Sequence, residues 1–406
     1  MKGGLAVLVP IEEARTLILG AVRGSGSEPV PLDRAWGRIL REPLVAADHQ
    51  PPFDRSAMDG FAVPALPPAG PWRCVRTITA GEIAGAPLEA GTCAAVNTGA
   101  ALPAATARVV PVEWTCREGD IITTDRPLGP DYIRRCGADC RKGDLLIRSG
   151  TRLDSPEIAV LAQHGAVHPQ VAALPRIVHL VAGDELVEAC DEPGDGRMRD
   201  TNSPMVRALV RETLGGAGTL VSLRSGDDPE AQVEMLQQSG ITHTPVLILS
   251  GGAWKSDRDN GAALLERLGY AWLFRGVDLR PGKPFSAAGR DGRLAFLVPG
   301  NPVAHWVTWH LFIRPALQAM MGAGTDPVLM EVPLGRDWNP GPETRVLRWP
   351  CRLRFTPEGP RADPLELASS GDLSGLAGAN ALLHHVPVDR PLSAGRPVTV
   401  QILRCP

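Results

Sequence analysis

A parallel α/β sheet is predicted to begin with Arg176-Ile177-Val178-His179-Leu180-Val181, a mostly apolar run that follows Pro175. Strand patterns and helix patterns alternate along the chain after it. Further strands are predicted at 218–223, 245–249 and 294–298, and helices at 205–214, 229–239, 261–268 and 303–320. Strands that are separated by helices in this way form a parallel sheet with right-handed connections.

Three glycine-bearing motifs directly follow predicted strands, where ligands of α/β proteins usually bind. They are Gly183-Asp184-Glu185, Ser250-Gly251-Gly252 and Pro299-Gly300-Asn301-Pro302, and they are expected to meet along one edge of the sheet. The second motif can present successive backbone N–H groups to a phosphate, although Gly-Gly after a strand is common in α/β proteins generally. Before the third motif, Arg280 and Lys283 flank a Pro-Gly turn that would project both cations together.

A second chemical signal is the loop Pro51-Pro52-Phe53-Asp54-Arg55-Ser56-Ala57-Met58-Asp59-Gly60, which precedes a short hydrophobic strand. The two prolines favour an extended approach, and the glycine is a residue that can adopt a positive φ. Two carboxylates and a hydroxyl packed this closely favour a binding loop. An Asp/Ser-rich turn that caps a helix or strand explains the same residues equally well.

Composition sets the class of protein. A chain of 406 residues, of which 44% are hydrophobic, is expected to form several domains. The net charge of −3 argues against nucleic-acid binding, and no apolar run is long enough to cross a membrane. The N-terminal apolar run falls short of a signal peptide. The eight cysteines form no C-x-x-C pair, so we expect no structural zinc and reduced thiols in the cytoplasm.

The remaining segments predict smaller units. An amphipathic helix is predicted at 11–23, and short apolar runs between 61 and 133, split by glycine and proline, predict a small β domain. Strand patterns resume at 345–349 and 398–403, which indicates a small C-terminal barrel.

Taken in order, the motifs resemble those of the molybdopterin molybdenumtransferases, the MoeA/gephyrin E-domain family. The resemblance rests on the Pro51 loop and the three strand-end motifs, together with Asn97-Thr98-Gly99-Ala100, Gly137-Ala138-Asp139, Asp200-Thr201-Asn202-Ser203 and Arg280-Pro281-Gly282-Lys283-Pro284. Any one of these motifs is a weak signal. The ordered set covers nearly the whole chain and is specific.

This resemblance implies a multidomain α/β plus β fold. Its parts are an elongated N-terminal linker domain at 1–45 and 141–173, a small β-rich domain at 46–140, a parallel α/β, MogA-like, molybdopterin-binding domain at 174–324, and a C-terminal β-barrel at 325–406. Family members are homodimers whose cleft joins the α/β domain of one subunit to the β domain of the other. A homodimer is therefore expected here.

The implied function lies in molybdenum cofactor biosynthesis, as Mg²⁺-dependent insertion of molybdate into adenylylated molybdopterin with release of AMP. The partners implied are adenylylated molybdopterin, molybdate, a second copy of the chain, and other cofactor-biosynthesis proteins or molybdoenzyme chaperones. An alternative is a MoeA-like protein that has lost the insertase activity and acts as a cofactor-binding or scaffolding protein. A generic nucleotide-binding α/β enzyme is a third hypothesis, but it leaves the Pro51 loop unexplained.

Individual residue roles also follow from the resemblance. The substrates are anions, so a site needs cations, backbone N–H groups or Mg²⁺ beside its carboxylates. The catalytic acids implied are Asp54, Asp59, Glu185, Asp227 and Asp259. The Mg²⁺ ligands implied among them are Asp59, Glu185, Asp227 and Asp259. The substrate-binding residues implied are Ser56, Thr98, Asp139, Ser250, Gly251, Gly252, Lys255, Arg280, Lys283, Pro299, Asn301, Pro302 and Ser370. Asp227 and Asp259 are also explained as caps of the helices that follow them.

Two segments depart from the family pattern. Val181-Ala182 stands where family members usually have a Ser-Thr pair, and Ala253-Trp254-Lys255-Ser256-Asp257-Arg258-Asp259 replaces a small turn that bears valine and glycine. Either the added cations clamp a phosphate or oxyanion more firmly, or the added bulk narrows the pocket and abolishes turnover.

Overall fold

A computed structural model of the chain describes residues 8–65, 70–126, 129–215, 220–241, 244–251, 260–341, 344–385 and 391–404. Backbone contacts divide it into two compact units. Unit 1 comprises Met1–Arg41, Gly150–Ser155 and His168–Pro406, and unit 2 comprises Glu42–Ser149 and Pro156–Val167. Within the described ranges, no helix has the length and apolar character needed to span a membrane.

Unit 1 is built on a six-stranded sheet with the order β16-β13-β17-β20-β19-β18. The strands are β13 (Ile177–Ala182), β16 (Leu220–Ser225), β17 (Val246–Ser250), β18 (Ala271–Arg275), β19 (Ser286–Arg290) and β20 (Arg293–Val298). The first four strands in the spatial order are parallel, as predicted from the alternation of strand and helix patterns. The hairpin of β18 and β19, where no strands were predicted, adds two antiparallel strands at one side of the sheet.

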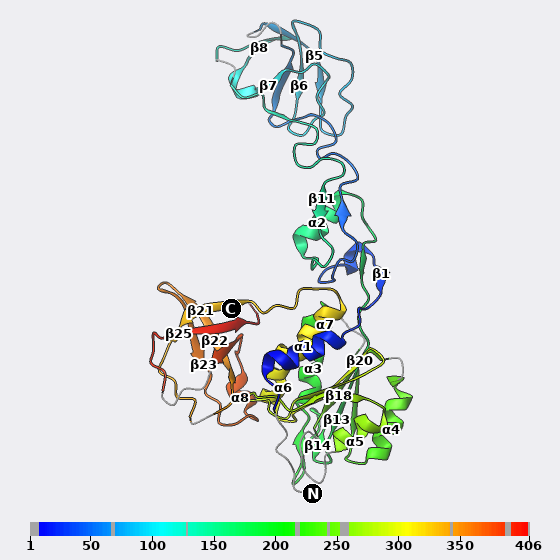
Figure 1. Cartoon of the computed structure of the whole chain (residues 1–406). Coiled ribbons are helices and arrows are strands. Elements are labelled where there is room, and N and C mark those ends of the chain that lie inside the picture. The colour runs from blue at the N-terminus through cyan, green and yellow to red at the C-terminus, as the bar shows by residue number, and fades with distance from the viewer. Residues whose placement is uncertain are drawn as a thin grey trace. The chain divides into compact units, whose positions relative to one another are not determined.

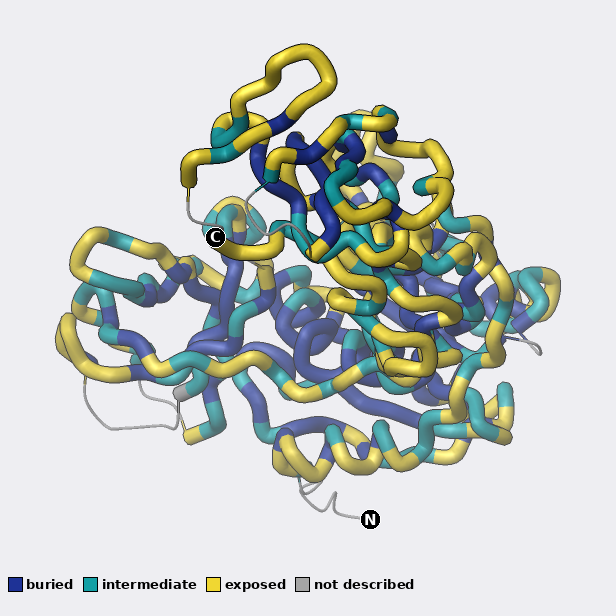
Figure 2. The backbone as a smooth tube through the Cα atoms, turned by 90° about the horizontal axis from the view of Figure 1, so that it is seen from above, coloured by how far each residue is buried: buried dark blue, intermediate teal, exposed yellow. Residues whose placement is uncertain are grey.

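Helices cover both faces of this sheet (Figure 1). They are α1 (Ile11–Ala21), α3 (Asn202–Leu214), α4 (Pro229–Gln238), α5 (Asn260–Arg267), α6 (Pro302–Thr308) and α7 (Arg314–Met320), with a π-helical turn at Trp309–Ile313 between the last two. Alternate residues of β17 face opposite layers. Ile248 packs with α1, α3 and α7, whereas Leu247 and Leu249 pack with α4 and α5. The strands β13, β17 and β20 are almost wholly buried, and buried backbone is dark blue in Figure 2.

The C-terminal part of unit 1 is a five-stranded antiparallel sheet with the order β21-β25-β24-β22-β23. Its strands are β21 (Leu329–Pro333), β22 (Leu347–Thr356), β23 (Gly359–Pro364), β24 (Ala381–His385) and β25 (Pro397–Ile402), and a short helix, α8 (Leu373–Leu376), precedes β24. A bridge between Leu334 and Ala362 joins the two edge strands, so the sheet nearly closes. This closure confirms the predicted barrel.

Small two-stranded ladders complete unit 1. They pair β1 (Ser27–Pro29) with β12 (Gln170–Ala172) and β14 (Leu186–Val187) with β15 (Met198–Arg199), and a 3₁₀ turn spans Leu32–Arg34.

Unit 2 contains a six-stranded sheet with the order β7-β4-β6-β5-β9-β8. The strands are β4 (Gly60–Val63), β5 (Trp72–Ile78), β6 (Thr92–Val96), β7 (Arg108–Pro111), β8 (Cys116–Glu118) and β9 (Ile121–Thr123). Two ladders pair β2 (Leu44–Val45) with β11 (Leu145–Ile147) and β3 (Arg55–Ser56) with β10 (Ile133–Arg134), and α2 spans Ser155–Gln163. The predicted small β domain is thereby found, and the exact borders of the four domains stay predictions.

Candidate functional site

Three strand-end turns meet at the carboxyl edge of the unit 1 sheet. Gly251, which follows β17, has a φ of +93°, and a Cβ built on it would lie 2.6 Å from the carbonyl oxygen of Ala182 at the end of β13. A Cβ on Gly300, which follows β20, would lie 3.6 Å from the Cα of Gly251. The turns therefore pack backbone against backbone, as expected, and Gly251 must be glycine.

The turn after β20 is held by the first residues of α3. Asn202 Nδ2 donates a hydrogen bond of 2.8 Å to the carbonyl oxygen of Gly300. The buried carboxylate of Asp200 accepts a 3.0 Å hydrogen bond from the N–H of Ser203. The motif at 200–203, which was singled out by resemblance, thus fixes the position of the third glycine turn.

The connection between β18 and β19 lies at the same edge. Arg275 pairs with Ser286, and Ser286 pairs with Leu297 near the end of β20. Because β19 runs opposite to β20, residues 276–285 leave and re-enter the sheet beside the carboxyl end of β20. The unpredicted hairpin is thus what brings Arg280 and Lys283 to the glycine turns.

A cavity of about 290 Å³ lies at this edge. The predicted site residues that line it are Arg280, Lys283, Pro299, Asn301 and Ser370. Arg345, Trp349 and Ser369 line it too, and the sequence patterns did not identify them. Three cations and no carboxylate are found among the described lining residues, so the cavity suits an anionic ligand.

Backbone pairing joins the two domains that build this cavity. The N–H of Arg280 donates to the carbonyl oxygen of Val346 at 2.9 Å, and the N–H of Arg348 donates to that of Arg280 at 3.1 Å. The pairing brings Arg345 and Trp349 of the C-terminal domain beside the turn that carries Arg280. No sequence motif marks these two residues, and only the tertiary pairing reveals them.

Ser370 is placed by contacts with the third glycine turn. Asn301 Nδ2 donates to Ser370 Oγ at 2.8 Å, and the N–H of Val303 donates to the Ser370 carbonyl oxygen at 3.0 Å. The predicted pair of Asn301 and Ser370 is therefore brought together at one wall of the cavity. Pro302 is the first residue of α6 and does not line the cavity.

Ser250 points into the core of unit 1. Its side chain is buried, and its Oγ lies 2.8 Å from Nε2 of His179 and 3.5 Å from Nδ1 of His305. Burial lowers the pKa of His179 to about 4 and that of His305 to about 3, so both rings are neutral at neutral pH. The N–H of Gly251 donates to the Val298 carbonyl oxygen at 3.4 Å. The Ser250 hydroxyl and the Gly251 N–H therefore both have partners within the protein. The predicted anion-binding role of this turn gains no support from its described part.

The predicted acids that the structure describes at this edge, Glu185 and Asp227, belong to no three-residue metal-binding group among the described residues. Glu185 is exposed, and Asp227 lines a small hollow of about 10 Å³ with Asn260, whose Nδ2 donates to the Asp227 carbonyl oxygen at 2.8 Å. The Asp227-Asp228-Pro229 pattern caps α4, as the helix-cap alternative predicts, and the capping residue is Asp228, whose side chain accepts a hydrogen bond from the N–H of Glu230. In the part of the chain that the structure describes, no three His, Cys, Asp or Glu side chains group to hold a metal ion. One chain's described residues therefore do not fit Mg²⁺ on their own.

In unit 2, two predicted residues form a close pair. The exposed Asp59 carboxylate accepts hydrogen bonds from the backbone N–H of Thr98 at 2.6 Å and from its hydroxyl at 2.8 Å. The backbone hydrogen bond, followed by the hydroxyl, holds the pKa of Asp59 below its usual value. Both hydrogen bonds reach Oδ1, and the exposed carboxylate is accessible to a ligand.

Three other predicted residues of unit 2 have internal partners. Asp54 pairs with Arg135 at 3.0 Å and accepts the N–H of Cys136 at 2.7 Å. Asp139 forms an ion pair with Arg134, and the Ser56 hydroxyl, which is buried, donates to the Met58 carbonyl oxygen at 2.6 Å. These contacts hold the loop in its conformation, which is the structural role that the turn-forming alternative assigns to these residues.

Gly60 can adopt a positive φ because it is glycine, but it does not do so in the structure. The structure gives another reason for the glycine. A Cβ built on Gly60 would lie 2.1 Å from the carbonyl oxygen of Val110 on the neighbouring strand β7. Close approach of two strands, rather than a turn, requires a residue with no side chain here.

Three predicted residues, Gly252, Lys255 and Asp259, lie outside the described residues, together with the rest of the altered turn at 253–258.

The fold and the cavity define a multidomain protein with a central α/β sheet and a cationic cavity at the carboxyl edge of that sheet. A family model described as the MoeA N-terminal region (domain I and II) matches residues 9–165, and one described as a probable molybdopterin binding domain matches residues 179–319. The chain belongs to the MoeA family, the molybdopterin molybdenumtransferases.

Relatives agree over nearly the full length. The chain is 28% identical over 402 residues to a molybdopterin molybdenumtransferase of Staphylococcus aureus (strain Mu50), which covers 97% of this chain and 95% of the relative. It is 29% identical to that of Staphylococcus epidermidis (strain RP62A), over 91% of this chain and 90% of the relative. A crystal structure of the molybdopterin biosynthesis MoeA protein from Pyrococcus horikoshii OT3 superposes with a TM-score of 0.82 at 27% identity, covering 98% of this chain and all of that one.

Proposed function

We propose that the protein inserts molybdate into adenylylated molybdopterin, with Mg²⁺, and releases AMP. The observation that carries this proposal is the cavity lined by Arg280, Lys283 and Arg345, without a described carboxylate. Arg280 and Lys283 lie within residues 179–319, the range that matches the molybdopterin-binding family model. Full-length similarity to proteins named molybdopterin molybdenumtransferase supports the same activity.

The lining residues suit a polyanionic substrate. Arginine guanidinium groups donate paired hydrogen bonds to phosphate oxygens, and Lys283 adds a point charge. Trp349 offers an aromatic surface to a flat ring system, and Asn301 and Ser370 supply neutral polar groups beside it. Water adds across the phosphoanhydride bond of the substrate, so one phosphate stays on the pterin and the other leaves with AMP, an anion whose charge these cations offset. Molybdate, a dianion attracted to the same positive cavity, then binds the two dithiolene sulfurs, and the two thiol protons leave with one of its oxygens as water.

Magnesium and dimerisation complete the proposal. The described residues of one chain hold no ready metal site, so we assign Mg²⁺ to Glu185 and Asp227 together with Asp259, and with an Asp59 supplied by a second subunit. Asp59 belongs to unit 2, and its carboxylate is exposed beside Thr98. A homodimer of the family type would bring such a carboxylate to the cavity edge. We place the reaction in the cytoplasm, with other cofactor-biosynthesis proteins or molybdoenzyme chaperones as further partners.

Turnover tests the proposal directly. Purified protein is mixed with adenylylated molybdopterin, molybdate and Mg²⁺, and AMP is measured by chromatography while protein-associated molybdenum is measured by mass spectrometry. We expect AMP and molybdopterin-bound molybdenum to appear together. Tight retention of the cofactor without AMP or molybdenum would refute the insertase and support the cofactor-binding or scaffolding alternative. The absence of both retention and turnover would refute both.

A further inference from the structure

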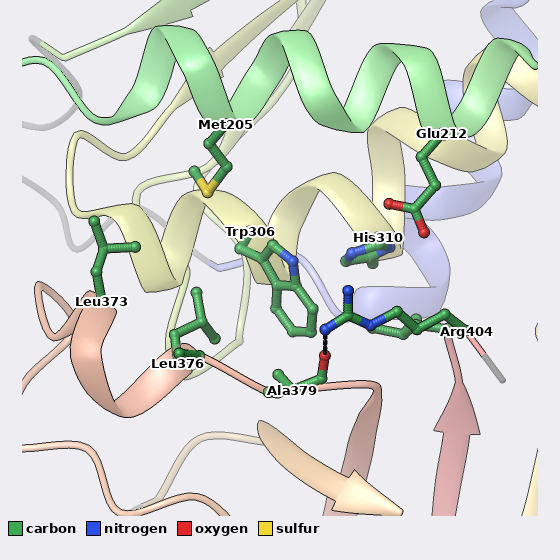
Figure 3. Close-up of a pocket in the computed structure, with 11 residues that line it drawn as sticks. Met205, Glu212, Trp306, His310, Leu373, Leu376, Ala379 and Arg404 are labelled. Atoms are coloured by element: carbon green, nitrogen blue, oxygen red, sulfur yellow. Dashed lines mark hydrogen bonds between the residues drawn. The ribbon is translucent and has the colours of Figure 1, made fainter. Parts of the chain in front are cut away.

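A second cavity in unit 1, of about 250 Å³, shares no lining residue with the cationic cavity. It lies between α3, the helical segment at 302–313 and the C-terminal domain (Figure 3). Its apolar wall is formed by Met205, Trp306, Leu373 and Leu376. A surface of this kind takes the apolar or aromatic part of a small molecule.

Two opposite charges stand at the same cavity. Glu212 projects from α3 and Arg404 follows β25, and both are exposed. The Arg404 guanidinium is oriented by a 2.9 Å hydrogen bond from Nη2 to the carbonyl oxygen of Ala379. No ion pair joins Glu212 to Arg404 in the described part of the chain. Figure 3 shows the two charged groups on either side of His310, so each can face a ligand group of opposite charge.

His310 supplies a third polar group. Its side chain is 3% exposed, and its Nδ1 has no hydrogen-bond partner among the described residues. The ring packs edge-on against Trp306, with centroids 4.6 Å apart. Burial lowers the pKa of His310 to about 3, so the imidazole is neutral near pH 7. A buried polar atom without a partner is costly, and a bound ligand or water is the usual way to satisfy it.

The local backbone at His310 is also unusual. Residues Trp309–Ile313 form a π-helical turn between α6 and α7. Such turns inside α-helices are rare and occur often at functional sites, because the extra residue re-aims a side chain. The chemistry assigned to the cationic cavity does not use this turn.

We propose that this cavity binds a small zwitterion with an apolar or aromatic side chain, of the chemical class of the apolar α-amino acids. The ligand's carboxylate faces Arg404, its ammonium faces Glu212, and its side chain packs on Trp306, Leu373 and Leu376. A simple anion would be repelled by Glu212, and a simple cation by Arg404. An uncharged apolar molecule would displace water from Arg404 and Glu212 without giving either charge a new hydrogen-bond partner. Only a ligand that carries both charges can pair with both Arg404 and Glu212.

Calorimetric titration of the full chain tests this inference, with L-phenylalanine as the probe. Two analogues separate the charges, since 3-phenylpropionate lacks the ammonium and phenethylamine lacks the carboxylate. We expect L-phenylalanine to bind and each analogue to bind about tenfold more weakly or worse. The substitution Arg404→Ala should weaken binding of L-phenylalanine and 3-phenylpropionate by a similar factor and strengthen binding of phenethylamine, whose ammonium Arg404 repels. Glu212→Gln should weaken binding of L-phenylalanine and phenethylamine and strengthen binding of 3-phenylpropionate, whose carboxylate Glu212 repels.

A matched control is Arg396→Ala, which removes an exposed arginine of the same C-terminal domain that lies away from the cavity and should leave binding unchanged. Lack of binding by L-phenylalanine at millimolar concentration overturns the inference. So does binding that is the same in Arg404→Ala, Glu212→Gln and the wild type. The binding measurement is independent of AMP release, so its failure leaves the proposed insertase activity standing.

Discussion

Replacement of Gly251 by alanine tests whether the glycine turns at the sheet edge really pack backbone to backbone. The substitution acts in two ways. Its φ of +93° lies in a region that costs an L-residue about 1–2 kcal/mol. The new Cβ would also lie 2.6 Å from the Ala182 carbonyl oxygen, a backbone atom that cannot rotate away. Forcing such a contact adds an overpacking cost of about 1–3 kcal/mol.

Gly196 provides the matched control for this experiment. It lies in the same unit with a φ of +74°, and a Cβ there would meet nothing within 4 Å. Gly196→Ala therefore carries the backbone cost alone. Urea denaturation followed by tryptophan fluorescence should show Gly251→Ala to be less stable than Gly196→Ala by about 1–3 kcal/mol. Equal stabilities of the two variants would refute the close packing of the turns after β13 and β17.

Three further predictions concern charge and titration. Arg280→Ala should weaken binding of AMP or molybdate by about tenfold or more, and the affinity of this variant should depend less on salt than that of the wild type. Arg396→Ala should leave the affinity unchanged. Equal effects of the two substitutions would contradict the assignment of the cavity to anion binding. Thr98→Val removes the hydroxyl donor 2.8 Å from Asp59 and keeps the backbone donor. The pKa of Asp59, measured by NMR titration, should therefore rise toward its ordinary value. Any stability that the ionised carboxylate adds should then be lost at a higher pH as the solution is acidified. Burial lowers the pKa of His179 to about 4 from an unfolded value of 6.5, so on acidification the unfolded state takes up the proton first. Between these two pH values the free energy of unfolding should fall by up to about 1.4 kcal/mol per pH unit. His179→Gln should remove this part of the pH dependence.

The patterns of strand and helix predicted the core of unit 1 well because periodicity reports burial directly. The four parallel strands and the meeting of the three glycine turns followed from it. The β18–β19 hairpin was missed because β19 reads Ser286-Ala287-Ala288-Gly289-Arg290, which has little β-branched or aromatic character. Its placement beside β20 is set by tertiary packing that no local pattern encodes.

Site prediction failed where a residue's neighbour came from another domain. Arg280 and Lys283 were identified from a turn motif, but Arg345 and Trp349 reach the same cavity only through the pairing of Arg280 with Val346. Ser250 was placed at the ligand by its motif, yet strand alternation turns its hydroxyl toward His179 in the core. The motif located the edge of the sheet correctly and could not show which way each side chain faces.

The position of molybdate in a crystal tests the central claim most directly. Crystals soaked with molybdate and AMP, with data collected at the molybdenum absorption edge, would locate the metal without bias. The cationic cavity predicts an anomalous peak within hydrogen-bonding reach of Arg280, Lys283 and Arg345. A peak elsewhere in the molecule, with this cavity holding neither molybdate nor AMP, would contradict it.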